Sequence, residues 1–279
     1  MEKALLATEQ SNPRTAHIDK MTTMEMLHAM NEENRRVADA VEDALSQIAP
    51  LVDHIAEEME KGGRIFYIGA GTSGRLGVID AAECPPTFGV SPDKVVAVMA
   101  GGTGAMANAS EGCEDDAEAG EHDLMKYSIN EHDTVIGISA AGAAAYVIGA
   151  MEAAKRVGAS TASICCNPDT PMSKIADYPI FANTGAEAIT GSTRLKAGTA
   201  QKFILNMIST CVMIKLGNVY GNYMINLNPT NIKLRKRAIR TICTLTGCDE
   251  KLAEDALDKN GNVRGAIEAI KGESVGGAK

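Results

Sequence analysis

The chain has 279 residues, of which 45% are hydrophobic and 23% are charged, and its formal net charge is -9. This size and composition predict a globular protein with one large domain and an appendage. The acidic balance argues against a nucleic-acid surface, no apolar run is long enough for a membrane span, and the N-terminus lacks the apolar segment of a signal peptide. We therefore expect a cytoplasmic protein with no nucleic-acid or membrane partner.

The seven cysteines include no Cys-x-x-Cys pair, and the histidines show no paired spacing. These cysteines are typical of small buried residues in a reducing compartment, so we expect no metal site. The basic cluster from Lys233 to Arg240 has helical spacing, and a solvated helix face is its simplest interpretation.

Residues 1–61 are predicted to form an N-terminal arm and helices. Residues 1–22 are polar and contain a Ser-Asn-Pro breaker, so we expect this arm to be ordered only against a partner or a neighbouring subunit. From Thr23 to Lys61 apolar residues recur at spacings of three and four, which predicts amphipathic helices that stop at Gly62. Such helices more often serve packing or dimerisation than chemistry.

Strand and helix patterns alternate through the segment 62–228. Predicted strands cover 64–69, 95–99, 134–138 and 161–165, and predicted helices cover 73–84, 105–119 and 143–157. This alternation predicts an α/β fold with a parallel sheet sandwiched by helices. Ligands of such folds bind at the carboxyl ends of the strands.

The first such strand end carries the run Gly-Ala-Gly-Thr-Ser-Gly at residues 69–74. Gly71 lets the backbone approach an anion, the first N–H groups of the following helix point at it, and Thr72 and Ser73 add hydroxyl donors. No acidic residue closes the next strand, so the run is not a dinucleotide fingerprint. The pattern favours a phosphate monoester, and the alternative is a turn without a ligand.

Two later segments repeat this chemistry. Ser139 and Gly142 lie in a turn after the strand 134–138, where a second phosphate-binding turn is predicted. Glu187, Ser192 and Lys196 precede an apolar helix predicted over 203–216. Hydroxyls and cations at a helix start can hold an anion or can simply cap the helix, and both interpretations stay open.

Two carboxylates are candidates for acid–base chemistry because of their positions. We expect the helix that begins after Gly71 to end near Glu83, because Pro85 and Pro86 disfavour helical geometry in the preceding residues. Glu114 lies on the predicted helix 105–119, after the glycine-rich end of the strand 95–99. One neutral and one ionised carboxyl group can supply an acid and a base. The simpler alternative for the acidic residues around Glu114 is a solvated acidic helix.

The last part of the chain, 229–279, is predicted to form a small helical domain. Asn-Pro-Thr-Asn at 228–231 is a helix start signal, Gly247 ends the first helix, and two short helices follow at roughly 249–258 and 262–270.

Five sequence blocks together resemble one family. They are Gly69-Ala-Gly-Thr-Ser-Gly-Arg-Leu-Gly77, Glu83-Cys-Pro-Pro-Thr87, Glu111-Gly-Cys-Glu-Asp115, Thr190-Gly-Ser-Thr-Arg-Leu-Lys-Ala-Gly-Thr-Ala-Gln-Lys202 and Pro229-Thr-Asn-x-Lys-Leu234. In this order they resemble N-acetylmuramic acid 6-phosphate etherases. The resemblance implies the sugar isomerase (SIS) fold over 62–228, a UBA-like helical domain over 229–279, a homodimer with sites near the subunit interface, and no metal or other cofactor.

The resemblance also implies a function. Members are lyases of peptidoglycan recycling that remove D-lactate from the sugar 6-phosphate and leave N-acetylglucosamine 6-phosphate. By this resemblance Glu83 protonates the departing lactyl oxygen and Glu114 is the base at C2. The C2 proton is acidic only beside the C1 aldehyde, so an acid and a base must both reach an open-chain sugar.

One segment departs from the family pattern. Where the family has Ala-Ser-Gly-Arg-Thr-Pro-Tyr, this chain has Ala140-Ala-Gly-Ala-Ala-Ala-Tyr146. Two hydroxyls and a guanidinium are missing, and each lost charge-assisted contact costs about 1.5 to 3 kcal/mol. We therefore expect the loop Ala140–Ala145 to weaken phosphate binding. The alternative functions are a non-catalytic phosphosugar-binding regulator and a sugar phosphate isomerase.

Overall fold

The computed structural model describes residues 5–108, 111–227, 229, 231–272 and 274–275. The chain divides into two compact units, one formed by 1–81 with 95–208 and the other by 82–94 with 209–279. The helices of residues 23–61 therefore belong to the same unit as the central sheet. The domain boundaries expected from the sequence, at 61/62 and 228/229, remain predictions.

The first unit is built on a five-stranded sheet in the order β2-β1-β3-β4-β5, in which every pair is parallel. Ile65 of β1 pairs with Val95 of β2 and with Thr134 of β3. All residues of β1 and β3 are buried, as expected of apolar strands covered on both faces. The strands are β1 (Ile65–Gly69), β2 (Val95–Met99), β3 (Thr134–Ile138), β4 (Ser160–Cys165) and β5 (Tyr178–Phe181).

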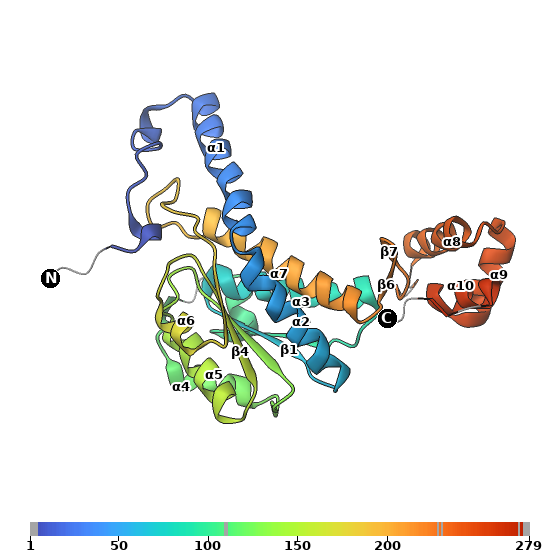
Figure 1. The fold of residues 1–279 in the computed structure, drawn as a ribbon. Helices are drawn as coiled ribbons and strands as arrows, with labels where there is room; N and C mark the ends of the chain where they lie inside the picture. The colour runs from blue at the N-terminus through green and yellow to red at the C-terminus, as the bar shows by residue number, and fades with distance from the viewer. Residues whose placement is uncertain (1–4, 109–110, 228, 230, 273, 276–279) are drawn as a thin grey trace. The chain divides into compact units, whose positions relative to one another are not determined.

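Helices cover both faces of this sheet, which confirms the predicted fold class (Figure 1). The helices α4 (Ala117–Met125), α5 (Ala145–Arg156) and α6 (Pro171–Ile175) lie on one face. On the other face lie α2 (Leu45–Glu60) and the first parts of α3 (Gly71–Phe88) and α7 (Lys196–Lys215). The core between the sheet and α5 contains Phe66, Ile68, Val135, Val147 and Met151.

Two glycines allow α4 and α5 to approach closely. A Cβ on Gly120 of α4 would lie 1.9 Å from the carbonyl oxygen of Tyr146, and one on Gly149 of α5 would lie 2.1 Å from that of Ala117. No side chain fits at either position without moving a helix backbone. The α4–α5 contact therefore depends on both glycines.

The helix α3 does not end near Glu83, so that expectation was wrong. It runs to Phe88 with Pro85 and Pro86 inside it. Proline removes a helix hydrogen bond, but its fixed φ is close to the helical value. The side chains of Cys84 and Phe88 are buried and hold the last turn, and the N–H of Gly89 closes it on the carbonyl of Pro85 at 2.9 Å.

The predicted helix 105–119 was also wrong. Two short 3-10 turns, η3 (Gly102–Met106) and η4 (Glu111–Cys113), stand in its place, and α4 begins only at Ala117. Asp116 ends the irregular segment because its carboxylate accepts the N–H of Ala119 at 2.9 Å and caps α4. Glu114 consequently lies in a turn and not on a helix.

The N-terminal segment forms two 3-10 turns, η1 (Ala7–Glu9) and η2 (Ile18–Lys20), before α1 (Thr23–Glu42). We expected residues 1–22 to be ordered only against another molecule. Within the described part, Thr8, Asn12 and Thr15 are instead buried against their own chain. The reason is that their polar groups find hydrogen-bond partners in the first unit, so the segment needs no second subunit to be satisfied.

The second unit contains the C-terminal helices α8 (Ile232–Thr246), α9 (Glu250–Asn260) and α10 (Val263–Lys271) and a hairpin of β6 (Val219–Tyr220) and β7 (Tyr223–Met224). Asn231 caps the start of α8 and Gly247 ends it, as predicted, whereas Asn228 and Thr230 of the start signal lie outside the described residues. The helices enclose a core of their own around Ile242, Leu257 and Ile267. No described helix has the length and apolar character needed to cross a membrane.

The glycine contact between α4 and α5 yields a stability prediction. We expect Gly120→Ala to lower the free energy of unfolding by about 1 to 3 kcal/mol because overpacking forces the helices apart. Urea denaturation measures this, with Gly104→Ala as the control, since a Cβ there meets no atom within 4 Å. Equal stability of the two variants would contradict the close approach.

Candidate functional site

The first predicted phosphate turn lies where β1 ends and α3 begins. Gly71 has a φ of +53°, in the left-handed region that favours glycine, and the first N–H groups of α3 have no partner within the helix. Thr72 and Ser73 are half-buried at this helix start. Backbone N–H groups and two hydroxyls therefore gather at one point, as anion binding requires.

Gln201 on α7 adjoins this turn and was missed as a separate candidate. The Ser73 hydroxyl donates a hydrogen bond to the Gln201 Oε1 at 2.9 Å. The Nε2 of Gln201 is buried and has no acceptor among the described residues. A buried donor without a partner is unfavourable, so a group that accepts its hydrogen bond would be stabilised there. The only sequence signal for Gln201 was its place in the Thr190–Lys202 block.

The second turn is closed by its own serine. The N–H of Gly142 donates to the Ser139 hydroxyl oxygen at 3.1 Å, and Gly142 has a φ of +67°. A Cβ on Gly142 would lie 2.5 Å from the Thr170 side chain, so only glycine fits. The carbonyl of Ala140 accepts a hydrogen bond from the Asn167 side chain at 2.9 Å. Contacts with Ser139, Asn167 and Thr170 thus fix the backbone of this turn. The alanine residues of the loop do not remove these contacts.

A buried carboxylate caps the start of α7. Glu187 is fully buried and accepts the N–H groups of Lys196 and Ala197, each at 2.9 Å. The next N–H, of Gly198, is bound by the carbonyl of Thr193 at 2.9 Å. The helix α7 begins at Lys196, earlier than the expected residue 203. The reason is that Glu187, which precedes the polar segment 192–202, supplies the carboxylate that caps its first N–H groups.

The start of α7 contacts both predicted phosphate turns. A Cβ on Gly198 would meet the methyl group of Thr72 at 3.3 Å, so this glycine lies against the first turn. Ala197 packs with Ala140 of the second turn and with Cys166. The structure therefore brings together the segments of Gly71, Thr72 and Ser73, of Ser139 and Gly142, and of Glu187, Ser192 and Lys196. Their direct contact with a ligand remains a prediction.

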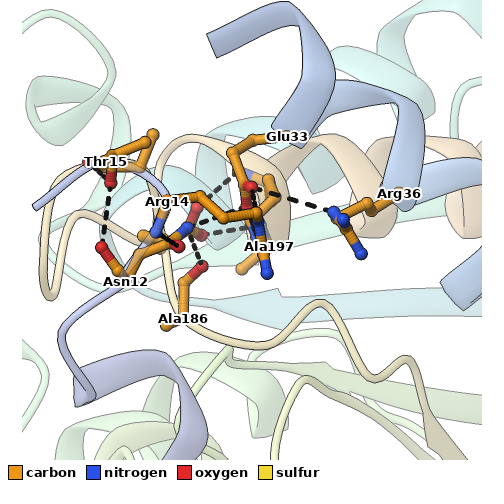
Figure 2. Close-up of polar contacts among 10 residues, drawn as sticks. Asn12, Arg14, Thr15, Glu33, Arg36, Ala186 and Ala197 are labelled. Atoms are coloured by element: carbon orange, nitrogen blue, oxygen red, sulfur yellow. Dashed lines mark hydrogen bonds and ion pairs between the residues drawn. The ribbon is translucent and has the colours of Figure 1, made fainter. Parts of the chain in front are cut away.

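Lys196 forms a buried ion pair with Glu33 of α1. Figure 2 shows Glu33 with its neighbours Asn12, Arg14 and Arg36. The side chains of Lys196 and Glu33 are each only 1% exposed, and the Lys196 Nζ lies 2.6 Å from the Glu33 Oε2. Asn12 donates to the same oxygen at 2.9 Å, and Arg14 binds both carboxylate oxygens. The Lys196 charge is therefore already paired within the chain.

This cluster changes the pKa of Glu33. Burial by itself raises the pKa of the Glu33 carboxyl, but hydrogen bonds from Arg14, Lys196 and Asn12 outweigh burial and lower the pKa to about 2. Arg36 adds a further cation at 3.8 Å. Glu33 consequently stays ionised at neutral pH.

The two candidate catalytic carboxylates belong to different units. Glu83 is exposed on α3 in the part that the second unit contains. Glu114 is exposed in the first unit, and its turn is fixed by a hydrogen bond from the Tyr146 N–H to the Glu114 carbonyl at 2.9 Å.

Arg75, near the start of α3, binds the irregular segment 105–108, which precedes Glu114 in the chain. Its guanidinium donates to the carbonyls of Ala105, Met106 and Asn108 at 2.7, 3.1 and 3.1 Å. Arg75 belongs to the sequence block Gly69–Gly77. No feature of the sequence indicated that its side chain binds the carbonyls of residues 105–108. Among the described residues, no group of three or more His, Cys, Asp or Glu side chains is arranged to hold a metal ion.

The Glu33 cluster predicts a pH effect on stability. Because the folded-state pKa of Glu33 is lowered, its stabilising contribution is present above about pH 4.5 and is lost as the pH falls towards about 2. We expect the difference in free energy of unfolding between the parent chain and Glu33→Gln to shrink by roughly 3 kcal/mol over this range. Urea denaturation at several pH values measures it. Glu32→Gln, at an exposed ion pair, is the control, and a difference that stays constant with pH would contradict the prediction.

Comparisons with known proteins agree with this architecture. Residues 47–155 match the glucokinase regulatory protein N-terminal SIS domain, and residues 105–210 match the SIS domain. The solved structure of a phosphoheptose isomerase from Neisseria gonorrhoeae has a TM-score of 0.50 and 19% identity, covering 68% of this chain and 98% of that one. A protein from Listeria monocytogenes has a TM-score of 0.51 and 17% identity, covering 69% and 91%. These likenesses confirm the SIS-type fold.

Relatives that share much more sequence carry one name. N-acetylmuramic acid 6-phosphate etherase from Halalkalibacterium halodurans is 54% identical over 92% of this chain and 87% of the relative. The etherase from Caldanaerobacter subterraneus is 52% identical over 96% and 88%, and that from Serratia proteamaculans is 49% identical over 94% and 88%. The expected resemblance is thereby confirmed, and the chain belongs to the N-acetylmuramic acid 6-phosphate etherase family.

Proposed function

We propose that this chain is a carbon–oxygen lyase that releases D-lactate from N-acetylmuramic acid 6-phosphate and leaves N-acetylglucosamine 6-phosphate. The observation that carries the proposal is the retention of the first phosphate turn and of Glu83 and Glu114 in a chain about half identical to etherases over nearly its whole length. This function belongs to peptidoglycan recycling.

The start of α3 is the proposed anchor for the phosphate. The N–H groups at Gly71, Thr72 and Ser73 have no partner within the helix, and the helix dipole favours negative charge at this end. The Thr72 and Ser73 hydroxyls lie beside them. Ser139, Gly142 and Ser192 are proposed to complete the phosphosugar site, because their segments adjoin the α7 start.

The proposed chemistry divides between the two glutamates. Glu114 removes the C2 proton of the open-chain sugar, and the electron pair forms a C2–C3 double bond as the C3–oxygen bond breaks. Glu83 gives a proton to the departing lactyl oxygen. Water then adds its hydroxyl at C3 and a proton returns to C2, which completes the exchange of lactate for water. A general acid and a general base suffice for these steps, so we expect no cofactor.

We propose that the chain forms a homodimer, and the length of α3 supports this proposal. Glu83 lies twelve residues beyond Gly71 on this helix, which is about 18 Å along its axis. A hexose phosphate anchored at the start of α3 is too short to reach Glu83 of the same helix. We therefore infer that Glu83 of the partner subunit serves each site. The exposed apolar side chains Ile79, Phe203 and Met207, on α3 and α7, support a second copy as the cover for this surface.

The free state of the cysteines supports a cytoplasmic location. All seven are free thiols, including Cys165 and Cys166, which are buried next to each other in the chain. Chains that work in oxidising compartments use such residues for disulfides more often.

Lactate release tests the proposed function directly. We expect the chain to release D-lactate from N-acetylmuramic acid 6-phosphate, and Glu83→Gln to reduce kcat by about 10² to 10⁴ because it removes the general acid. A lactate dehydrogenase-coupled assay measures both. If the parent chain released no more lactate than Glu83→Gln at high substrate, the lyase proposal would fail. Thermal stabilisation by the sugar phosphate without turnover would then favour a phosphosugar-binding regulator. Formation of a ketose would favour an isomerase.

The alanine-rich loop predicts a gain of affinity. We expect Ala141→Ser, Ala143→Arg and Ala144→Thr together to lower KM by at least about tenfold, since one charge-assisted contact is worth roughly 1.5 to 3 kcal/mol. Ala144 is the N-cap of α5 and forms no side-chain cap, so threonine there also raises stability by about 1 kcal/mol. Ala144→Thr alone is the control for this effect. An unchanged KM in the triple variant would refute our account of the second turn.

A further inference from the structure

Residues 5–22, which we call the strap, form hydrogen bonds with Asn167 beside the second turn, with the segment that leads into α7, and with Glu33 of α1. At one end, the Thr8 hydroxyl accepts a hydrogen bond from the Asn167 Nδ2 at 3.0 Å. The same Asn167 nitrogen donates to the carbonyl of Ala140 in the second turn at 2.9 Å. One side chain therefore connects the strap to the backbone of that turn.

The middle of the strap lies on the segment that leads into α7. Asn12 donates to the carbonyl of Ala186 at 3.3 Å, and the Thr15 hydroxyl donates to that of Ala188 at 2.8 Å. These carbonyls flank Glu187, the residue that caps α7. A cavity of about 270 Å³ opens between strap and segment, lined by Ser11, Asn12, Thr15, Ala16, Ile18, Ala188, Ile189 and Thr190.

The strap also supplies two of the three residues that donate hydrogen bonds to the Glu33 carboxylate. Asn12 and Arg14 of the strap bind this carboxylate (Figure 2). Lys196, from the α7 start, binds it as well. Glu33 itself belongs to α1. Removal of the strap would leave Lys196 and Glu33 as a buried pair with two donors fewer, and a buried pair needs such donors to offset its desolvation.

Polar contacts, and not apolar packing, hold the strap. Thr8, Asn12 and Thr15 are its buried residues, while Leu5 and Leu6 are exposed. The hydrogen bonds that join the strap to the rest of the first unit depend on the positions of Asn167, of the carbonyls in the segment 186–188 and of Glu33. Docking of the strap and the arrangement of the site segments are therefore linked in one equilibrium.

We propose that the strap is a positioning element of the phosphosugar site, in which Asn12, Arg14 and Glu33 set the α7 start and Thr8, through Asn167, sets the second turn. Binding of a sugar phosphate and docking of the strap then favour each other by the same factor, as linkage requires. This inference rests on the proposed function only in taking these segments as the binding site.

Arg14→Met tests the proposal against Lys20→Met. Each variant removes one cation from the strap, but Arg14 binds Glu33 and Lys20 is exposed on η2. We expect Arg14→Met to raise KM for N-acetylmuramic acid 6-phosphate by about tenfold, a usual size for coupling between sites, with kcat changed far less. Lys20→Met leaves both constants unchanged. Equal KM values in the two variants would overturn the proposal.

Hydrogen exchange gives a readout that needs no turnover. We expect N-acetylglucosamine 6-phosphate to slow exchange of the amides at 8–15 in the parent chain and in Lys20→Met, but not in Arg14→Met. Thr8→Val removes the hydroxyl that accepts from Asn167 but keeps the hydrogen bond from the Thr8 N–H to the Asn167 Oδ1, so it should show a smaller loss of protection. If the sugar phosphate left strap exchange unchanged in the parent chain while slowing it at 71–74, the strap would be a structural element only.

The two measurements separate this inference from the proposed function. Lactate release by the parent chain with no coupling to the strap would refute the inference and leave the lyase proposal intact. Slowed strap exchange in a chain that releases no lactate would refute the lyase proposal and support the positioning role.

Discussion

The buried ion pair between Glu33 and Lys196 is the interaction on which the architecture around the site depends. It places a helix from the N-terminal half against the start of α7, and both side chains are almost fully buried. Two charges in such surroundings are favourable only when further donors complete them, and Asn12 and Arg14 do so. The Glu33 carboxylate thus joins three distant parts of the sequence at one point.

Glu187 pairs the first N–H groups of α7 at the same helix start. A helix start carries unpaired N–H groups, and α7 offers them to a buried carboxylate and not to a ligand. The start of α3, by contrast, keeps its first N–H groups available beside two hydroxyls. The two helix starts therefore differ, because the start of α7 is capped within the chain and the start of α3 is the one that we propose for the phosphate.

Much of the fold was predictable because it depends on local patterns. Runs such as Ile65–Gly69 and Thr134–Ile138 are apolar enough to specify buried parallel strands, and Gly247 ends α8 as glycine commonly does. The local rule failed at Pro85 and Pro86, where buried neighbours keep the helix intact. It failed again at 105–119, where Arg75 binds carbonyls about thirty residues away in the sequence.

The candidate site was predictable in its membership more than in its geometry. Glycines and hydroxyls identified both turns, but nothing local showed that Glu187 caps α7 or that Lys196 is paired with Glu33, 163 positions away. In the second turn, Asn167 binds the backbone and Thr170 lies against Gly142, while the positions that depart from the family pattern are alanines. The backbone of this turn is therefore fixed independently of the side chains at 141, 143 and 144, so these three positions can be exchanged without disturbing the scaffold.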